Sequence, residues 1–418
     1  MKAIQNRNIR DAEVDIPGSK SISHRMLIMA ALCSGESVVK NVLNSEDTEL
    51  TVSALQLMGA VIQKTGNRVL RIKGFGGMPA PCADQIYLGN SGTSMRLLAS
   101  VAALGNTDYV LCGNARMCER PMCELLNALS MAGASTRSGN KEGTPPVVIN
   151  GKACTGGRVD IDCSVSSQYL SSLLIAGAIM DKGLDVQVIN GLVSTPYVNL
   201  TIDIMEKFQV HAEKRTAHEY SVAGRQSYVP GEFSVEPDLS NAGYFWIAGA
   251  VTGAGIKVRN VTPASPQGDV KLVYILRDMG CTLDIQEDGI TVRGNRLKGV
   301  DVDMGDMPDA VPGLAVAASF ADGKTSIRNI GHLRSKECDR IEAVASQLGK
   351  MGVNVETGED WMTVHGGKPH KAVIETFDDH RIAMAFAVAG LSVPGVVIEN
   401  QRCVAKSFPS FWEIFDAL

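Results

Sequence analysis

The sequence predicts a two-domain α/β protein built from six similar modules. A helix rich in small apolar residues recurs along the chain, and each copy is followed by a glycine and a short strand. The marker glycines recur at intervals of about 70 residues, a period typical of a repeated structural module, and they are Gly35, Gly105, Gly183, Gly255, Gly323 and Gly395. A chain of 418 residues is also too long for one ordinary hydrophobic core, which favours two domains.

A second repeated unit alternates with the first. It consists of a helix and two strands, and its copies end at Gly74, Gly151, Gly224, Gly294 and Gly366, of which the one ending at Gly224 is degenerate. Together the two units make six modules of βαβαββ type, three per domain, if N-terminal strands between Ala3 and Ile16 complete the last one. A solenoid is the alternative, but solenoid repeats are usually about 20–50 residues long and need capping ends.

Two segments are candidates for the crossings between domains. One is Pro17-Gly18, and the other is the stretch 228–232, whose Pro-Gly pair reads as a linker. We therefore expect one domain of residues 1–18 and 236–418, containing both chain ends, and a second of residues 19–235. We expect the active site in the cleft between them, where ligand sites commonly lie.

Composition narrows the class of protein. The chain is 45% hydrophobic and 20% charged, with a net charge of −5, so no general basic field attracts nucleic acid or membranes. Its ten cysteines lack the spacing of a zinc site and suit free thiols in a reducing compartment. Neither an apolar signal core nor a long apolar run is present. We expect a cytoplasmic protein without a metal.

Cations stand where apolar helices begin. Lys20 precedes the apolar stretch 26–32, Arg381 opens the last apolar helix, and Arg120 lies next to a helix start. Because Pro121 follows it, Arg120 is expected to be extended, which suits a fixed guanidinium. A cation at a helix N-terminus opposes the macrodipole unless an anion is present. The pattern therefore indicates bound anions, although capped surface helices with solvated cations remain the plain alternative.

Neutral donors and carboxylates occur at other helix starts. The glycine loop 88–96 can form a backbone anion nest, and the serine-rich stretches 164–168 and 194–197 offer hydroxyls. Asp309 stands just before the fifth apolar helix, and the run 334–340 contains three cations and two acids. Each motif also has an interpretation without a ligand. The glycine loop would then be a plain turn, the stretch 164–168 an over-capped helix start, and the run 334–340 a solvated charged face.

Together these motifs resemble the 5-enolpyruvylshikimate-3-phosphate synthase family of enolpyruvyl transferases. The resemblance spans nearly the whole chain and follows the order of the motifs Lys20-Ser21 with Arg25, Gly89-Asn90-Ser91-Gly92-Thr93, Arg120-Pro121, Ser166-Ser167-Gln168, Pro308-Asp309, Lys336-Glu337-Cys338-Asp339-Arg340, Asp379-His380-Arg381 and Ala405-Lys406-Ser407-Phe408-Pro409. It implies an inside-out α/β barrel in each of two domains, with three βαβαββ modules per domain.

The resemblance also implies a reaction. The enolpyruvyl group of phosphoenolpyruvate would be transferred to the 5-hydroxyl of shikimate 3-phosphate, with release of phosphate, in the shikimate pathway to chorismate and the aromatic amino acids. No cofactor is implied, and a monomer is expected. Asp309 would be the base on the 5-hydroxyl, and Glu337 or Lys20, Glu337 first, would supply the methylene proton.

The residues implied for each substrate are drawn from both halves of the chain. Shikimate 3-phosphate would be held by Lys20, Ser21, Arg25, Ser166, Ser167, Gln168, Ser194, Tyr197, Asp309 and Lys336. Phosphoenolpyruvate would be held by Lys20, Asn90, Gly92, Thr93, Arg120, Gln168, Arg340, Arg381 and Lys406.

Two departures from the family pattern stand out. His332 occupies a position where the family often has Asn or Glu, so that contact is left open, and Arg96 is followed by Leu97 where the family usually has Pro. Gly92 leaves room beside the enolpyruvate site, which implies that the phosphonate herbicide glyphosate is an inhibitor.

Two rival functions remain at this stage. The sister enzyme UDP-N-acetylglucosamine enolpyruvyl transferase has a reactive cysteine five residues before the Arg-Pro pair, where this chain has Ala115, and Cys118 is in the wrong place. The other rival is a non-catalytic anion-binding repeat scaffold. Such a scaffold does not explain why Asp309 and Glu337 stand among the cations.

Overall fold

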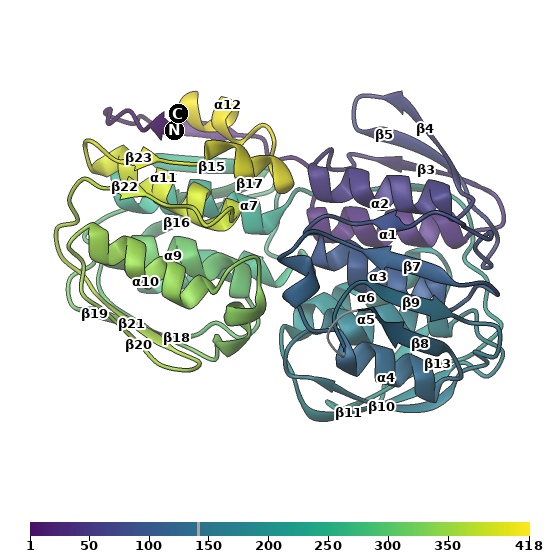
Figure 1. Cartoon of the computed structure of the whole chain (residues 1–418). Helices are drawn as coiled ribbons and strands as arrows, with labels where there is room; N and C mark the ends of the chain where they lie inside the picture. Colours follow the sequence, from purple (N-terminus) through teal and green to yellow (C-terminus); the bar gives the residue numbers. More distant parts are fainter. Residues whose placement is uncertain (140–142) are drawn as a thin grey trace. The chain divides into compact units, whose positions relative to one another are not determined.

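The computed structural model describes residues 1–139 and 143–418, which fall into two compact units. Unit 1 comprises Met1–Pro17 and Pro237–Leu418, and unit 2 comprises Gly18–Glu236. Both chain ends therefore belong to unit 1, where Lys2 forms an ion pair with Asp416 at 2.6 Å (Figure 1). The two units are described separately.

The described residues of unit 2 form three four-stranded sheets of one design. In each sheet a parallel edge strand pairs with a central strand, which pairs in turn with an antiparallel hairpin. In sheet order, the strands are β14 (Glu232–Ser234), β3 (Glu36–Lys40), β5 (Val69–Lys73) and β4 (Val61–Gly66); β6 (Ile86–Tyr87), β7 (Tyr109–Cys112), β9 (Val147–Asn150) and β8 (Ser135–Ser138); β10 (Gly157–Cys163), β11 (Leu184–Leu192), β13 (Glu219–Val222) and β12 (Ala212–Lys214).

Unit 1 repeats this design in two four-stranded sheets and has a third sheet of three strands, in which β1 takes the place of the hairpin; the N-terminal strands contribute to two of the three sheets. The strand β1 pairs antiparallel with β23, and β2 pairs parallel with β15. In sheet order, the strands are β2 (Ala12–Val14), β15 (Gly255–Arg259), β17 (Gly289–Arg293) and β16 (Thr282–Gln286); β18 (Asp301–Asp303), β19 (Lys324–Arg328), β21 (Met362–His365) and β20 (Val355–Thr357); β22 (Val373–Ile374), β23 (Val397–Ile398) and β1 (Lys2–Ala3). The expected use of the N-terminal strands is confirmed, and the solenoid alternative is wrong.

The apolar helices lie inside each unit and the sheets lie outside (Figure 1). In unit 2 these helices are α1 (Lys20–Leu32), α3 (Gly92–Ala102) and α5 (Gln168–Gly177), and in unit 1 they are α7 (Leu239–Thr252), α9 (Val311–Ser319) and α11 (His380–Ser392). They are buried along nearly their whole length, and their many Ala, Gly and Ser residues let them pack closely. This arrangement confirms the inside-out α/β fold class, with six modules in the two units.

A second set of helices follows the central strands. These helices are α2 (Glu46–Leu57), α4 (Cys123–Met131), α6 (Thr195–Lys207), α8 (Leu272–Asp278), α10 (Arg340–Lys350) and α12 (Phe411–Asp416). Short 3₁₀ helices, which carry several charged residues, are η1 (Met117–Glu119), η2 (Gly268–Lys271), η3 (Pro308–Ala310), η4 (Gly331–Ser335) and η5 (Gln401–Lys406). Among the described residues, no helix combines the length and the apolar character that a membrane crossing requires.

An asparagine in the left-handed conformation marks the end of the central strand in four modules. Asn41, Asn190, Asn260 and Asn329 have φ values of 55°, 59°, 59° and 60°. Their side-chain amides donate to the end of the neighbouring parallel strand, to Val235 O, Asp162 Oδ2, Asp15 Oδ1 and Asp303 Oδ2 respectively. Asparagine tolerates this backbone conformation better than most residues. An asparagine side chain therefore links the central strand to its parallel neighbour at the equivalent position in four modules, two in each unit.

The expectation of a linker at residues 228–232 is wrong. Tyr228 is buried and its hydroxyl donates to Ile175 O at 2.9 Å. Glu232 begins β14, which supplies the parallel edge strand of the first sheet, and Phe233 stacks on Phe208 with ring centroids 3.8 Å apart. The Pro-Gly pair at 230–231 thus turns the chain into an edge strand within unit 2.

Steric crowding explains why the hairpins end in glycine. A Cβ at Gly294 would lie 2.0 Å from Ala250 O, and a Cβ at Gly366 would lie 1.9 Å from Ala321 O. Both carbonyls belong to the end of an inner helix or to the turn just after it. The hairpin can therefore reach the inner helix only where the side chain is absent.

We predict that Gly294→Ala lowers the free energy of unfolding of the full chain by about 1–3 kcal/mol, because the backbone must move to relieve the overlap. The measurement is urea unfolding followed by circular dichroism. The matched control is Gly349→Ala in α10, where an added Cβ meets nothing within 4 Å. This control is expected to stabilise the chain by about 0.5–1 kcal/mol, since Gly is a poor helix former. Equal unfolding midpoints for the two variants would contradict the steric explanation.

Candidate functional site

In unit 2, polar side chains meet at the starts of the inner helices. Gln168 is the first residue of α5, and its Nε2 donates to Thr93 Oγ1 of α3 at 2.9 Å. Its Oε1 accepts from Arg96 Nη1 at 2.9 Å, and the Arg96 guanidinium lies 5.5 Å from the centroid of the Tyr169 ring. These contacts hold the Gln168 carboxamide in one orientation.

Arg120 lies against the start of α3. Its backbone is extended (φ −81°, ψ 131°), as expected for a residue before proline, and its Nη1 donates to the backbone and side-chain oxygens of Asn90 at 3.3 and 3.4 Å. A Cβ at Gly92 would lie 2.6 Å from Arg120 Nη2. Glycine at position 92 is therefore what lets the guanidinium approach the helix start.

Lys20, the first residue of α1, is held by a carboxylate. Its Nζ lies 3.3 Å from Asp47 Oδ2, and the Asp47 side chain is only 4% exposed. Asp47 belongs to the first turn of α2, where a capping box between Ser45 and Thr48 fixes the helix start. The positive charge at the start of α1 is thus compensated by the protein itself, which the sequence analysis did not foresee. The Ser19 side chain, at the N-cap of α1, makes no capping hydrogen bond.

Arg25 is buried among hydroxyl and carbonyl oxygens. Its guanidinium donates to Thr201 Oγ1 at 2.7 Å, Ser171 Oγ at 3.4 Å, Tyr197 O at 3.2 Å and Ser21 O at 3.0 Å. Burial lowers the pKa of Arg25 to about 10. The guanidinium therefore remains charged at neutral pH and joins α1 to α5 and α6.

The expected serine ligands lie at the starts of α5 and α6. Ser166 and Ser167 are 5% and 4% exposed, and Ser166 Oγ accepts from Gln168 N at 3.3 Å. Ser194 is the N-cap of α6 in the left-handed conformation (φ 53°), and its side chain makes no capping hydrogen bond. We call these serines, together with Tyr197, Arg25 and the residues around Gln168, Arg120 and Lys20 described above, the unit 2 half-site.

In unit 1, one buried guanidinium binds three carboxylates. Arg340 Nε donates to Asp379 Oδ2 at 2.7 Å, Nη1 to Asp309 Oδ1 at 2.9 Å and Nη2 to Glu337 Oε2 at 2.9 Å. The Arg340 side chain is 2% exposed. Burial opposes its charge, but Asp379, Glu337 and Asp309 hold the pKa of Arg340 well above its usual range. The bland interpretation of this charged run as a solvated face is therefore wrong for Arg340 and Glu337.

Asp309 also binds a second buried arginine. Its Oδ2 accepts from Arg381 Nη2 at 2.8 Å, and Arg381 Nη1 lies 3.5 Å from the Tyr244 hydroxyl. Asp379 caps α11 by accepting from Arg381 N at 2.8 Å. Burial disfavours the charge on Arg381, yet the Asp309 carboxylate raises its pKa well above the usual range. Asp309 thus bridges Arg340 and Arg381, two of the three arginines expected for phosphoenolpyruvate.

Three further residues complete the unit 1 half-site. Lys336 ends η4 and is partly exposed, whereas Lys406 at the end of η5 is 7% exposed. His332 is 8% exposed, and its pKa is lowered to about 3, first by burial and then by the Lys336 charge. His332 is therefore neutral at neutral pH, and the charges of Asp309 and Arg340 also act on it.

Sequence reasoning missed several residues of the two half-sites. Asp47 and Arg96 carried no recognisable signal for their contacts with Lys20 and Gln168. Asp269 is 2% exposed in η2, and burial first, then the Asp309 charge, raises its pKa to about 6. Tyr244, which contacts Arg381, reads in the sequence as an ordinary core residue of α7.

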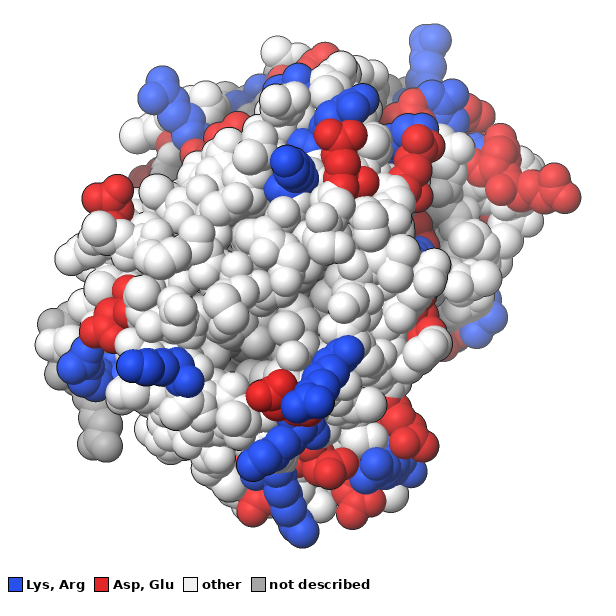
Figure 2. Space-filling model, turned by 90° about the vertical axis from the view of Figure 1, so that its right-hand side faces the viewer, with Lys and Arg blue, Asp and Glu red and all other residues white. Residues whose placement is uncertain are grey.

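The face of the molecule drawn in Figure 2 carries no single dominant charge. On the face drawn in Figure 2, Lys and Arg side chains alternate with Asp and Glu around a wide uncharged area. This mixed pattern agrees with the net charge of −5. The buried arginines among the described residues are Arg25, Arg96 and Arg120 in unit 2 and Arg340 and Arg381 in unit 1.

The fold and the paired sets of buried cations define the class of enolpyruvyl transferases. The structure of an EPSP synthase from Acinetobacter baumannii matches this chain with a TM-score of 0.84 at 29% identity, covering 99% of this chain and 97% of that one. The enolpyruvyl transferase NikO from Streptomyces tendae shares the fold, with a TM-score of 0.78 at 19% identity over 99% of this chain and 96% of that one.

The family itself is shown by sequence. The family model described as EPSP synthase (3-phosphoshikimate 1-carboxyvinyltransferase) matches residues 4–415, and the chain belongs to this family. A relative named 3-phosphoshikimate 1-carboxyvinyltransferase from Syntrophobacter fumaroxidans is 42% identical over 410 residues, 97% of each chain. Another of the same name from Aliivibrio salmonicida is 38% identical over 408 residues, 96% of each. The resemblance drawn from the motifs is confirmed.

We predict that Arg340→Met lowers the free energy of unfolding by about 3–5 kcal/mol at pH 7, because removing one partner of a buried ion network leaves uncompensated charges. The deficit should shrink as the pH falls toward 5. In the variant the clustered carboxyls have raised pKa values in the folded state, so protonation relieves their repulsion and restores stability at low pH.

The measurement is urea unfolding at a series of pH values. The matched control is Arg328→Met on β19, whose side chain is 58% exposed and pairs with Asp301 at 2.9 Å. This exposed pair should contribute at most about 1 kcal/mol. An Arg340→Met deficit as small as that of the control, or one that does not change with pH, would contradict the network.

Proposed function

We propose that this chain transfers the enolpyruvyl group of phosphoenolpyruvate to the 5-hydroxyl of shikimate 3-phosphate and releases phosphate. The reaction belongs to the shikimate pathway, which leads to chorismate and the aromatic amino acids. The observation that carries the proposal is the pair Asp309 and Glu337 on the Arg340 guanidinium, in a chain of the EPSP synthase family. This pair places two carboxylates suited to proton transfer beside a cation suited to an anionic substrate.

The unit 2 half-site supplies most of the contacts to shikimate 3-phosphate. The hydroxyls of Ser166, Ser167 and Ser194, with Tyr197 and Arg25, hold the phosphate. Burial of the two adjacent serines at the start of α5 supports this assignment, because buried hydroxyls near a helix N-terminus favour an anion. The ring hydroxyls bind Ser21 together with Asp309 and Lys336 of unit 1, while Lys20 and Gln168 lie near both substrates.

Phosphoenolpyruvate is held by cations of both units. Arg120 and Lys20 of unit 2 act with Arg340, Arg381 and Lys406 of unit 1, and the arginines grip carboxylate and phosphate through paired N–H donors. In addition, the segment of Asn90, Gly92 and Thr93 contributes donors at the start of α3. The two half-sites thus serve one reaction, in which the substrates engage residues 19–235 and residues 236–418 together.

The reaction requires two pairs of proton transfers. First, a proton is added to the methylene carbon of phosphoenolpyruvate, the 5-hydroxyl oxygen bonds to its C2, and the hydroxyl proton leaves to Asp309. Then a proton is removed from the new methyl group, the C2–O bond to phosphate breaks as the leaving phosphate oxygen takes up a proton, and the double bond re-forms. Glu337 is the first candidate for the methylene proton and Lys20 the second.

The ion pairs explain how the carboxylates become able to exchange protons. While Arg340 binds Asp309 and Glu337, both carboxylates are stabilised in the charged form. A substrate carboxylate or phosphate competes for the same N–H donors. Once the anion binds the Arg340 guanidinium, a nearby carboxylate loses its cationic partner and lies next to a second negative charge. Both changes favour the protonated form of that carboxylate. Substrate binding therefore prepares the acid–base groups.

The remaining assignments follow from composition and chemistry. The enzyme acts as a monomer in the cytoplasm, without a cofactor. Its ten cysteines support a reducing compartment, since all of them are free thiols and four of them, Cys33, Cys163, Cys281 and Cys403, are buried. Protein carboxylates and cations suffice for the proton transfers above.

Phosphate release tests the substrate assignment. The full chain is incubated with phosphoenolpyruvate and either shikimate 3-phosphate or UDP-N-acetylglucosamine. Release with the shikimate ester alone is expected. Release with the sugar nucleotide alone would mean that the acceptor site is misassigned, and no release with either would favour the non-catalytic scaffold.

We predict that Asp309→Asn lowers the turnover number by about 10²–10⁴-fold, the typical contribution of one positioned acid–base group. Asn keeps the shape and an acceptor toward Arg340 or Arg381 but cannot take the hydroxyl proton. Steady-state phosphate release measures the effect. The control Asp306→Asn, at an exposed position in the same loop, should retain wild-type turnover. A turnover of Asp309→Asn within a few fold of wild type would remove Asp309 from the role of base.

A further inference from the structure

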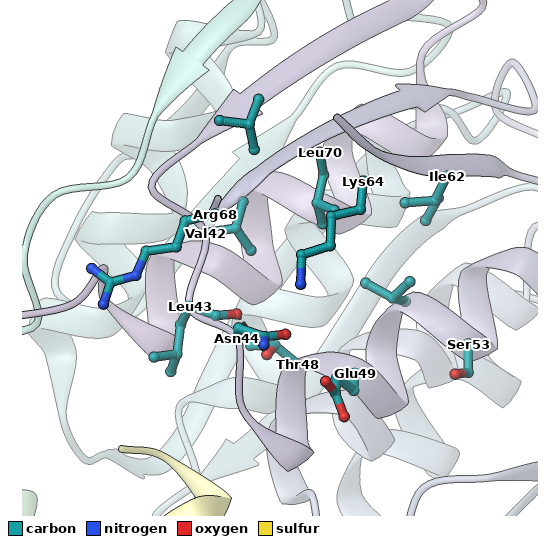
Figure 3. Close-up of a pocket in the computed structure, with 12 residues that line it drawn as sticks. Val42, Leu43, Asn44, Thr48, Glu49, Ser53, Ile62, Lys64, Arg68 and Leu70 are labelled. Carbon is teal, nitrogen blue, oxygen red and sulfur yellow. Dashed lines mark hydrogen bonds between the residues drawn. The ribbon is translucent and has the colours of Figure 1, made fainter. Parts of the chain in front are cut away.

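Unit 2 contains a pocket that neither half-site uses. It has a volume of about 340 Å³ and lies between α2 and the β4–β5 hairpin (Figure 3). Its lining residues come from the loop before α2, from α2 itself and from the hairpin, and they are Val42, Leu43, Asn44, Thr48, Glu49, Val52, Ser53, Ile62, Lys64, Arg68, Val69 and Leu70. The volume is at the small end of the range of about 300–1,000 Å³ typical of small-molecule sites.

The walls of the pocket are mainly apolar. Val52 of α2 and Ile62 and Leu70 of the hairpin all line the pocket, and Val52 and Leu70 are only partly covered by protein. Covering such surface contributes roughly 25 cal/mol for each Å² of apolar area removed from water. A ligand with a compact apolar body would therefore gain binding free energy here.

Three charged side chains line this pocket. The Arg68 guanidinium points away from Lys64 (Figure 3), whereas Lys64 and Glu49 carry opposite charges beside the apolar surface. The Lys64 side chain extends from β4 toward Asn44 and Glu49, which belong to the start of α2 and the loop before it (Figure 3). Within the part of the chain that the structure describes, neither the Lys64 ammonium nor the Glu49 carboxylate forms a hydrogen bond or an ion pair with the protein. Each can therefore accept a ligand group of opposite charge.

We propose that this pocket binds a small zwitterion with an apolar body, that is, a free α-amino acid with an apolar side chain. The ligand carboxylate binds Lys64, its ammonium binds Glu49, and its side chain covers Val52, Ile62 and Leu70. A simple carboxylate fits less well because Glu49 would repel it, and a simple amine fits less well because Lys64 would repel it. The small volume excludes a folded partner.

Isothermal titration calorimetry of the full chain tests the proposal with three probes. L-phenylalanine carries both charges, 3-phenylpropionate lacks the ammonium, and 2-phenylethylamine lacks the carboxylate. L-phenylalanine is expected to bind most tightly, and each analogue about 5-fold more weakly, since one exposed ion pair contributes up to about 1 kcal/mol. No heat of binding with L-phenylalanine at millimolar concentration, or equal affinity for all three probes, would overturn the proposal.

Two variants assign the charges. Lys64→Gln should weaken L-phenylalanine about 5-fold without weakening 2-phenylethylamine. Glu49→Gln should weaken L-phenylalanine by the same factor without weakening 3-phenylpropionate. Both side chains are exposed, so the fold is retained. The matched control is Lys73→Gln, at an exposed position on β5 outside the pocket, which should bind L-phenylalanine as the wild type does. Variants that all bind L-phenylalanine equally would show that these charges do not make the site.

Discussion

The unit 1 half-site depends on one buried cation, the guanidinium of Arg340. Its three nitrogens donate to three carboxylates, with Nη2 reaching both Glu337 and Asp379. These carboxylates come from the cap of α11, the short helix before α9 and the loop before α10. A guanidinium taken out of water is costly unless its donors are all satisfied. The starts of these helices are therefore held together by the same interaction that gathers three carboxylates around one arginine.

The two half-sites meet the requirement of an anionic substrate in different ways. In unit 2, hydroxyls, a carboxamide and backbone oxygens surround the cations, and Lys20 is paired with Asp47. In unit 1, carboxylates hold the arginines. Unit 2 thus surrounds its cations mainly with neutral acceptors, whereas unit 1 pairs its arginines with ionisable carboxylates.

Close packing of small residues makes both half-sites possible. Inner helices rich in Ala, Gly and Ser can lie side by side, and a hairpin ending in glycine can touch the helix end without a clash. Helix starts then meet within each unit, so that residues such as Thr93 and Gln168, far apart in the sequence, come within hydrogen-bonding distance. Because the same helix geometry repeats within each unit, the fold brings polar side chains from several helix starts close together.

The sequence by itself determined the six-module architecture, the inside-out fold class and the family. It could do so because these features leave a repeated local pattern of residues in the sequence. Gly294 and Gly366 must be glycine because backbone oxygens leave no room for a Cβ, and Arg120 is extended because proline follows it. Apolar small-residue helices with polar starts are likewise visible in consecutive residues. For the same reason most of the candidate site residues could be named from motifs alone.

Only the tertiary structure decided which partners these residues have. The pairing of Lys20 with Asp47, the contact of Arg96 with Gln168 and the strand beginning at Glu232 all join segments distant in the sequence. No local pattern encodes them. The neutral state of His332 and the raised pKa of Asp269 likewise arise from burial and from neighbouring charges that the fold brings near. Charge states and contacts are properties of the packed molecule, and the physical reason is that desolvation and Coulomb interactions depend on distance in space.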